Sequence, residues 1–227
     1  MKTFFKRLLP VLMMVAALSF NAQAKKTVDA NGYYNVMNAP QTHSKFKAQS
    51  KENQDGSFTT KIYSGKKLLQ TFKHEATSGE VRFIDMNFDG YVDLFVGPAS
   101  SRTYNIIYLY NKKTGKFVPT QGEVSLNGFF LVNDKKKHFV GMGSNGANST
   151  FYQLYTWNGN KLEVSQSLME FSDNEYDEPN GFTTKYTLIR GNDYYSSASV
   201  GCLIMATNKF SKLPKEWQKI IKSFEKM

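Results

Sequence analysis

The residues best suited to chemistry form one short oxygen-rich stretch, whose sequence pattern is D-x-N-x-D-G-x-x-D. Side chains ending in oxygen occupy its positions one, three, five and nine, and the glycine at position six allows a sharp turn. A hard cation such as calcium takes six to eight oxygen ligands, and the residue at position seven of such a loop binds through its backbone carbonyl. The spacing therefore predicts calcium as a cofactor. Its expected ligands are Asp85, Asn87, Asp89, Tyr91 and Asp93.

The flanking residues indicate which kind of calcium loop this is. An EF-hand places a glutamate at position twelve and a helix on each side, but Val96 stands at position twelve. Residues 81–84 and 94–96 are rich in branched and aromatic side chains, which is typical of strands. We therefore expect a β-loop-β calcium site. The alternative is an Asp/Asn/Gly turn that binds no metal.

Residues 81–118 resemble a known family. The loop reads DxNFDGYxDL, and it is followed by Tyr104, Tyr108, Tyr110 and the run 114–117, Thr-Gly-Lys-Phe. This segment is similar to the FG-GAP (integrin-type) calcium-loop repeat, and more closely to small periplasmic bacterial proteins built around one such loop. That group includes calcium-binding inhibitors, or immunity proteins, of lysozyme-like peptidoglycan hydrolases. The resemblance implies bound calcium, a propeller-like β fold and a protein partner.

The first 24 residues have the features of a secretory signal peptide. A basic start with Lys2, Lys6 and Arg7 precedes an apolar run over 8–18, and 22–24, Ala-Gln-Ala, forms a cleavage site. The apolar run is shorter than the ~20 residues that a transmembrane helix needs. We therefore expect a periplasmic or secreted protein without a transmembrane segment, whose mature chain begins at Lys25.

The formal net charge of the chain is +10. This balance favours anionic partners, such as phosphorylated envelope polymers or an acidic protein, and we expect no nucleic-acid partner. Lysine pairs and triplets at 66–67, 112–113 and 135–137 lie near expected turns, where they keep strand edges from pairing with other chains. The single cysteine, Cys202, excludes an intrachain disulfide, and its apolar neighbours predict a buried side chain.

Short strands separated by turns occupy most of the chain and predict an all-β fold. Residues 104–110 and 151–157 are similar aromatic strands that begin 47 residues apart, each after an apolar strand that ends in glycine. Such a period is typical of propeller blades. The expected class is antiparallel sheets in a propeller-like arrangement, with a sandwich-like arrangement as the alternative.

The two ends of the mature chain differ from this pattern. Residues 25–50 are polar and weakly patterned, and we expect partial disorder there. Residues 51–227 are expected to form a single β domain that ends in a short amphipathic helix over 214–226. The apolar stripe of this helix is Trp217, Ile220, Ile221 and Phe224. We expect the stripe to pack on the domain; the alternative is contact with an anionic membrane.

These features favour an extracytoplasmic calcium-binding protein that binds a macromolecular partner and is not an enzyme. The sequence contains no metalloprotease spacing and no nucleophile elbow. The specific hypothesis is inhibition of a lysozyme-like cell-wall hydrolase. Arg102, in the segment after the calcium loop, is the candidate partner-binding residue, because a guanidinium makes bidentate bonds to a catalytic carboxylate. The alternatives are an ordinary surface arginine and, for the function, an envelope glycan-binding protein or glycan-acting enzyme.

Overall fold

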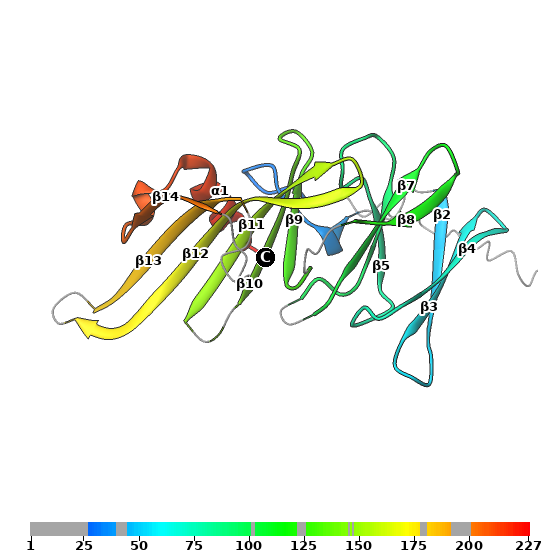
Figure 1. Ribbon diagram of the computed structural model, residues 1–227, viewed down its shortest axis with the longest axis horizontal. Helices are drawn as coiled ribbons and strands as arrows, with labels where there is room; N and C mark the ends of the chain where they lie inside the picture. The colour runs from blue at the N-terminus through cyan, green and yellow to red at the C-terminus, as the bar shows by residue number, and fades with distance from the viewer. Residues whose placement is uncertain are drawn as a thin grey trace, which may run out of the picture.

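The computed structural model describes residues 27–39, 45–100, 103–121, 126–144, 146, 148–177, 181–191 and 201–227, without the side chains of 173–177 and 181–183. Within these ranges the fold is antiparallel β-sheet with one short C-terminal α-helix, as predicted. Three sheets follow one another along the long axis of the molecule (Figure 1). Their faces pack on each other, so the sandwich-like form of the expected class describes the fold.

The smallest sheet lies at one end of the molecule (Figure 1). It contains β2 (Phe46–Glu52), β3 (Phe58–Ser64) and β4 (Lys67–His74). The β3–β4 turn contains Gly65, whose φ of 58° lies in the left-handed region that glycine adopts at low cost. Phe46 and Ile62 are buried against Phe83 and Phe117 of the middle sheet, which fixes the small sheet on one face of it.

The middle sheet is a meander of four strands taken in chain order. These are β5 (Val81–Ile84), β6 (Asp93–Val96), β7 (Ile106–Asn111) and β8 (Lys116–Pro119). All four residues of β6 are buried. Leu94 packs toward the small sheet and Phe95 toward the large sheet, because successive side chains of a strand point to opposite faces. The middle sheet is therefore covered on both faces.

The large sheet has seven strands in the order β1-β9-β10-β11-β12-β13-β14. Their bounds are β1 Tyr34–Asn35, β9 Phe129–Asn133, β10 His138–Ser144, β11 Ser149–Asn158, β12 Lys161–Asp177, β13 Gly181–Arg190 and β14 Cys202–Thr207. The strands β9 to β12 form a second meander in chain order. Residues 106–110 lie on β7 and 151–157 on β11, each the third strand of its meander. The 47-residue spacing thus corresponds to a structural repeat.

The expectation of disorder over 25–50 is wrong for the described part, 27–39 and 45–50. Tyr33 and Tyr34 are 1% and 5% exposed, β1 pairs with β9, and a short 3-10 helix η1 (Val36–Asn38) follows. The Asp29 carboxylate accepts hydrogen bonds from the backbone amides of Asn31 and Tyr33, both at 2.8 Å. Burial of the two tyrosine rings outweighs the polar composition of their neighbours.

The C-terminal helix α1 spans Lys215–Phe224 and follows a 3-10 helix η3 (Phe210–Lys212), with Pro214 at its N-cap. Its predicted apolar stripe is buried against Leu131, Val140 and Leu168 of the large sheet. Packing on the domain is therefore confirmed. No helix in the described part of the chain is long and apolar enough to cross a membrane.

The expected burial of Cys202 is wrong. Its side chain is exposed, and Leu203 and Ile204 next to it are 64% and 41% exposed. The reason is position: β14 is the last strand of its sheet and pairs only with β13 among the described strands. An apolar run predicts a central strand, but at the edge of a sheet it leaves side chains in solvent.

Candidate metal site

The candidate calcium loop connects β5 to β6. These two strands pair antiparallel, and Ile84 lies opposite Asp93 in the ladder. The ladder therefore brings the first and last positions of the loop together. The strands on both sides confirm the β-loop-β context that distinguishes this loop from an EF-hand.

Three of the predicted ligand side chains gather around the loop backbone. The backbone amide of Asp89 donates to both Asp85 Oδ1 at 3.1 Å and Asn87 Oδ1 at 3.2 Å, so the two oxygens share one N–H. Asn87 Nδ2 donates to Asp89 Oδ2 at 3.2 Å. Gly90 N donates to Asp85 Oδ2 at 2.9 Å, with a φ of 88° at Gly90 that closes the turn. The structure thus brings Asp85, Asn87 and Asp89 together.

Asp93 lies deeper than the other acidic residues and has a different set of partners. Its side chain is fully buried, and Oδ2 accepts hydrogen bonds from the backbone amides of Met86 at 3.0 Å and Asn87 at 3.4 Å. Oδ1 accepts from the amide of Tyr110 on β7 at 2.9 Å. Asp93 therefore joins the start of the loop to the neighbouring strand.

Two carboxylates of the loop, the fully buried Asp93 and the half-buried Asp85, have raised pKa values. Burial raises the pKa of Asp93 to about 7, against the opposing effect of its backbone hydrogen bonds, and the charges of Asp89 and Asp85 add to the rise. Burial also raises the pKa of Asp85, and the nearby charge of Asp89 contributes. A bound cation would favour the charged form of each group, because an opposite charge at short range lowers a carboxyl pKa.

The donor set fits a hard cation in its chemistry. Every predicted ligand atom is an oxygen, and three of the side chains are carboxylates, which suits calcium rather than a soft metal. Among the described residues, no three His, Cys, Asp or Glu side chains already form a metal-binding group. The loop oxygens instead accept hydrogen bonds from the loop's own amides, so Asp85, Asn87 and Asp89 would exchange these partners for the ion.

Two anchors of the loop were not identified from the sequence. Tyr110 holds Asp93 through its backbone amide, and Trp157 Nε1 of β11 donates to the carbonyl of Met86 at 2.8 Å. The Met86 side chain is fully buried in the cluster between the middle and large sheets. The aromatic repeat in the sequence could have indicated these two anchors, because Tyr110 and Trp157 lie on β7 and β11. These are the matching third strands of the two meanders.

The remaining site predictions fall on different parts of the chain. Tyr91 lies in the loop, where its amide donates to Asp89 Oδ1 at 2.9 Å and its ring centroid lies 5.9 Å from that of Tyr110. Arg102 lies outside the described residues, between β6 and β7.

No protein-family model matches the sequence. No curated protein matches it either. Among solved structures, the fold is similar to one described as a Xanthomonas type IV secretion system related protein, with 12% sequence identity and a TM-score of 0.46. The similarity covers 79% of this chain and 96% of that chain.

Proposed function

We propose that this protein binds calcium outside the cytoplasm and uses the calcium-ordered loop to support binding of a macromolecular partner. The observation that carries the proposal is the loop at 85–93 between two paired strands, where the side-chain oxygens of Asp85 and Asn87 accept from one backbone amide and Asn87 bonds the Asp89 carboxylate. The signal-peptide features of residues 1–24 support an extracytoplasmic location. Extracellular calcium sites commonly bind at roughly 10⁻⁴–10⁻³ M, so a modest affinity would suffice there.

The anchors of the loop explain how a cation would affect more than the loop. Asp93 connects the loop to β7, and Met86 connects it to Trp157 on β11. Calcium would offset the repulsion between Asp85 and Asp89 and fix the loop against both strands. The expected result is a stiffer junction between the middle and large sheets, at the end of β6 where Asp93 lies beside Tyr110 of β7.

The specific form of the proposal is inhibition of a lysozyme-like peptidoglycan hydrolase. Its support is the similarity of residues 81–118 to the calcium-loop proteins described above. In this form the segment 98–102 enters the cleft of the hydrolase, and Arg102 bonds a catalytic carboxylate. The partner would then be a protein, and the chain itself would catalyse nothing.

Calcium binding is tested by thermal unfolding in millimolar calcium chloride, in magnesium chloride and in chelator. At a calcium concentration ~100-fold above the dissociation constant, binding to the folded state alone adds about 2.7 kcal/mol to the free energy of unfolding. For a protein of this size that shifts the melting temperature by roughly 5–10 °C. Asp89→Ala should remove the calcium response. An unchanged midpoint for the wild-type protein would overturn the proposal.

The hydrolase hypothesis is tested with a panel of purified muramidases acting on peptidoglycan, at micromolar protein with and without calcium. We expect calcium-dependent inhibition of at least one enzyme and its loss in Arg102→Ala. The matched control is Arg190→Ala, which removes an exposed arginine from β13. Absence of inhibition across the panel would refute this form of the proposal. Release of reducing ends by the protein alone would favour the glycan-acting alternative.

A further inference from the structure

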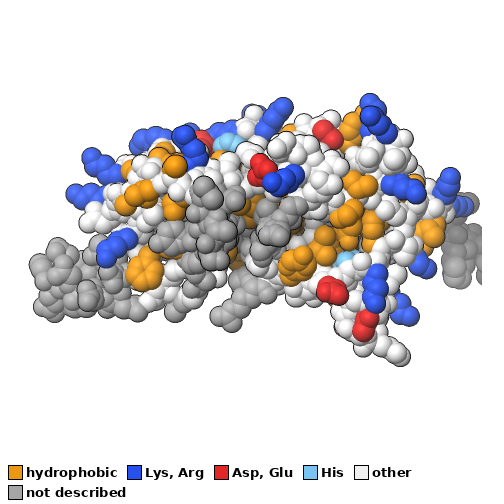
Figure 2. Space-filling view, in the orientation of Figure 1, with side chains coloured by type: hydrophobic (Ala, Val, Ile, Leu, Met, Phe, Trp, Pro, Cys, Tyr) orange, Lys and Arg blue, Asp and Glu red, His pale blue; other side chains and the backbone are white. Residues whose placement is uncertain are grey.

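The side of the large sheet that is covered by α1 carries a strongly basic surface, which we call the basic face. It combines the outer side of α1, the residues just before the helix and the turn between β9 and β10. Its lysines are Lys135, Lys136, Lys137, Lys209, Lys212, Lys215, Lys219, Lys222 and Lys226. Figure 2 shows Lys and Arg side chains in a row along the edge where Figure 1 places α1 and β14.

The helix contributes a straight line of charge to this face. Lys215, Lys219 and Lys222 recur at i, i+4 and i+7, a spacing that places them on one side of α1, and Lys226 lies in the turn that follows the helix. All four are exposed. At 1.5 Å per residue the line from Lys215 to Lys222 is about 10 Å long. The opposite side of the helix is buried in the domain. The line therefore lies parallel to the protein surface.

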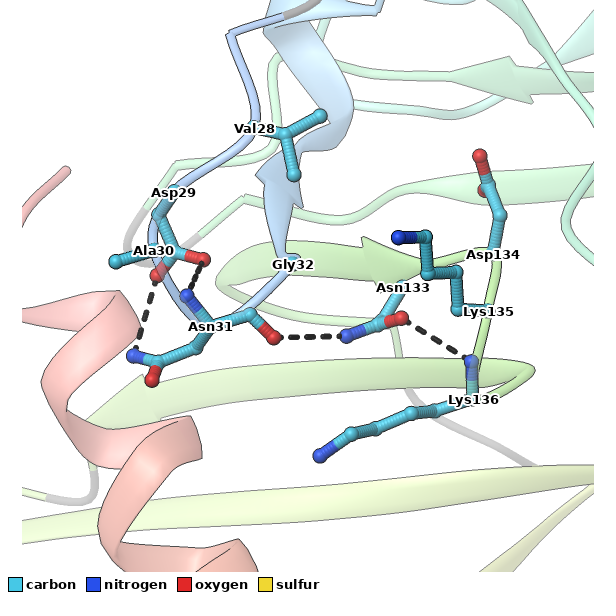
Figure 3. A pocket seen from close by; sticks show the side chains of 9 residues that line it. All are labelled: Val28, Asp29, Ala30, Asn31, Gly32, Asn133, Asp134, Lys135 and Lys136. Carbon is cyan, nitrogen blue, oxygen red and sulfur yellow. Dashed lines mark hydrogen bonds between the residues drawn. The ribbon is translucent and has the colours of Figure 1, made fainter.

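The β9–β10 turn is fastened beside the helix. Lys136 Nζ donates to Glu216 Oε1 at 2.6 Å, and Asn31 Nδ2 donates to Ser223 Oγ at 3.1 Å. Asn133 Nδ2 in turn donates to the carbonyl of Asn31 at 3.2 Å. Figure 3 shows the bond between Asn133 and Asn31 beside a cavity between the N-terminal segment and the turn, with α1 alongside; the cavity has a volume of 390 Å³. These bonds fix the lysines of the β9–β10 turn beside the lysines of α1, so the two groups form one continuous surface.

Part of the charge of the basic face stabilises the fold, through the bond from Lys136 to Glu216 and the contact of Lys222 with the Phe210 ring. The acidic residues that accompany its nine lysines are Asp29, Asp134, Glu216 and Glu225. Like charges at i and i+4 on a helix, such as Lys215 with Lys219, destabilise it by about 0.2–0.5 kcal/mol per pair. An anionic partner would convert this repulsion into attraction.

We propose that the basic face binds the anionic phospholipid headgroups of a membrane surface. The lysines spread over a helix line and an adjacent turn, which suits a plane of charges better than a linear polymer. Lysine is a point charge that suits diffuse electrostatic contact, whereas bidentate recognition of single phosphates favours arginine. The centres of protein interfaces are depleted of lysine and enriched in aromatic residues, whereas the aromatic residues of α1 are buried in the domain. Binding is therefore peripheral, because the apolar stripe of α1 is not free to enter a bilayer.

The helix line is separate from the proposed calcium loop. The loop joins β5 to β6 in the middle sheet, whereas α1 covers the far side of the large sheet. The β9–β10 turn lies nearer to the loop, because Tyr34 donates to Asp134 of the turn and its pKa is affected by Asp85 of the loop. Membrane binding is therefore expected in chelator and in the Asp89→Ala variant. Failure of the membrane proposal would leave the calcium proposal untouched, and the reverse also holds.

The test measures co-sedimentation of the full mature chain with vesicles in chelator. The vesicles are phosphatidylcholine alone or phosphatidylcholine with one third phosphatidylglycerol. The test variant changes Lys215, Lys219, Lys222 and Lys226 to Gln. The control variant changes Lys47, Lys51, Lys61 and Lys66 to Gln, four exposed lysines of the small sheet and its turn. Both variants have the same net charge, and thermal unfolding checks that both are folded.

We expect wild type and control to bind the anionic vesicles, with affinity that falls as salt is raised, and not the neutral ones. Each lysine near an anionic surface contributes about a fivefold change in partitioning, so the test variant should bind at least ~100-fold more weakly. Equal loss in both variants would overturn the proposal, since only net charge would matter. Absence of binding to the anionic vesicles at low salt would also overturn the proposal. This holds even if the protein still binds soluble polyphosphate or an acidic protein.

Discussion

Replacing Asp93 by alanine separates a structural role of this carboxylate from a role as a metal ligand. Asp93 is fully buried and accepts two short hydrogen bonds, from Met86 N at 3.0 Å and Tyr110 N at 2.9 Å, and a longer one from Asn87 N at 3.4 Å. Alanine would leave these donors without an acceptor. Each buried unsatisfied donor costs about 1–3 kcal/mol, so the two short bonds represent about 2–6 kcal/mol.

Part of that loss is offset. Burial raises the pKa of Asp93 to about 7, so the folded state disfavours the charged carboxylate. Replacing Asp93 by alanine therefore also removes part of the free-energy cost of burying this charge. We therefore expect a net loss of about 2–3 kcal/mol in the free energy of unfolding at neutral pH. Asp93→Asn keeps one acceptor oxygen and should lose about half as much.

The assay is urea unfolding in chelator, so that no calcium contributes. Asp89→Ala is the matched comparison, because Asp89 is exposed and its carboxylate bonds only within the loop. That variant should unfold near the wild-type midpoint in chelator and differ only when calcium is added. If Asp93→Ala unfolds like wild type in chelator, or if Asp89→Ala is the less stable of the two in chelator, the structural role assigned to Asp93 is wrong.

Three further predictions concern the rest of the chain. N-terminal sequencing of protein recovered from the periplasm or medium should begin at Lys25, and an intact Met1 there would contradict the signal peptide. Ile220→Ala should lower the free energy of unfolding by about 2–5 kcal/mol, because this side chain is fully buried between α1 and the large sheet; urea unfolding measures it, and a loss below 1 kcal/mol would contradict the packing. Burial lowers the pKa of His138, and hydrogen bonds from Lys136 and Tyr33 lower that of Glu216 against the effect of its burial. Both folded-state values lie below the unfolded ones, so these two groups contribute a loss of stability as pH drops below about 6.5 and a further loss below about 4.5. The raised pKa of Asp93 contributes a gain as pH falls below about 7, so the two losses are read from the difference between variant and wild type. Glu216→Gln should remove the lower of the two losses in a pH series of unfolding midpoints, and an unchanged profile would refute this.

Local patterns were sufficient for the parts of the fold that depend on neighbouring residues. Gly65, Gly115 and Gly159 mark β-turns and have positive φ in the structure. The 3.6-residue period of the helix stripe and the strand-like flanks of the loop are likewise local, and both were predicted. Such features are fixed by backbone sterics and by burial of one side of an element.

Features that depend on distant partners were missed. The Tyr33 hydroxyl donates to Glu216 Oε1 at 2.9 Å and lies 2.8 Å from His138 Nδ1, and neither partner is near it in sequence. The composition of residues 25–50 therefore could not predict the burial of Tyr33. The role of Asp93 was ambiguous for another reason. A carboxylate at position nine can serve either as a metal ligand or as an acceptor for the backbone amides of Met86 and Tyr110. The exposure of Leu203 depends on which strand ends the sheet, and an apolar run does not encode that order.

The hydrophobic cluster between the large sheet and α1 has a consequence for the order of folding. It contains Tyr33 near the start of the described chain and Trp217 to Phe224 at its end, together with Leu131 and Leu168 between them. Contacts between residues so far apart in sequence form late, because closing the intervening loop costs entropy before the contact is made. The outer face of the large sheet cannot be covered until residues 217–224 have been synthesised. A nascent chain therefore keeps the apolar side chains of this face exposed after all the strands of the large sheet have been made.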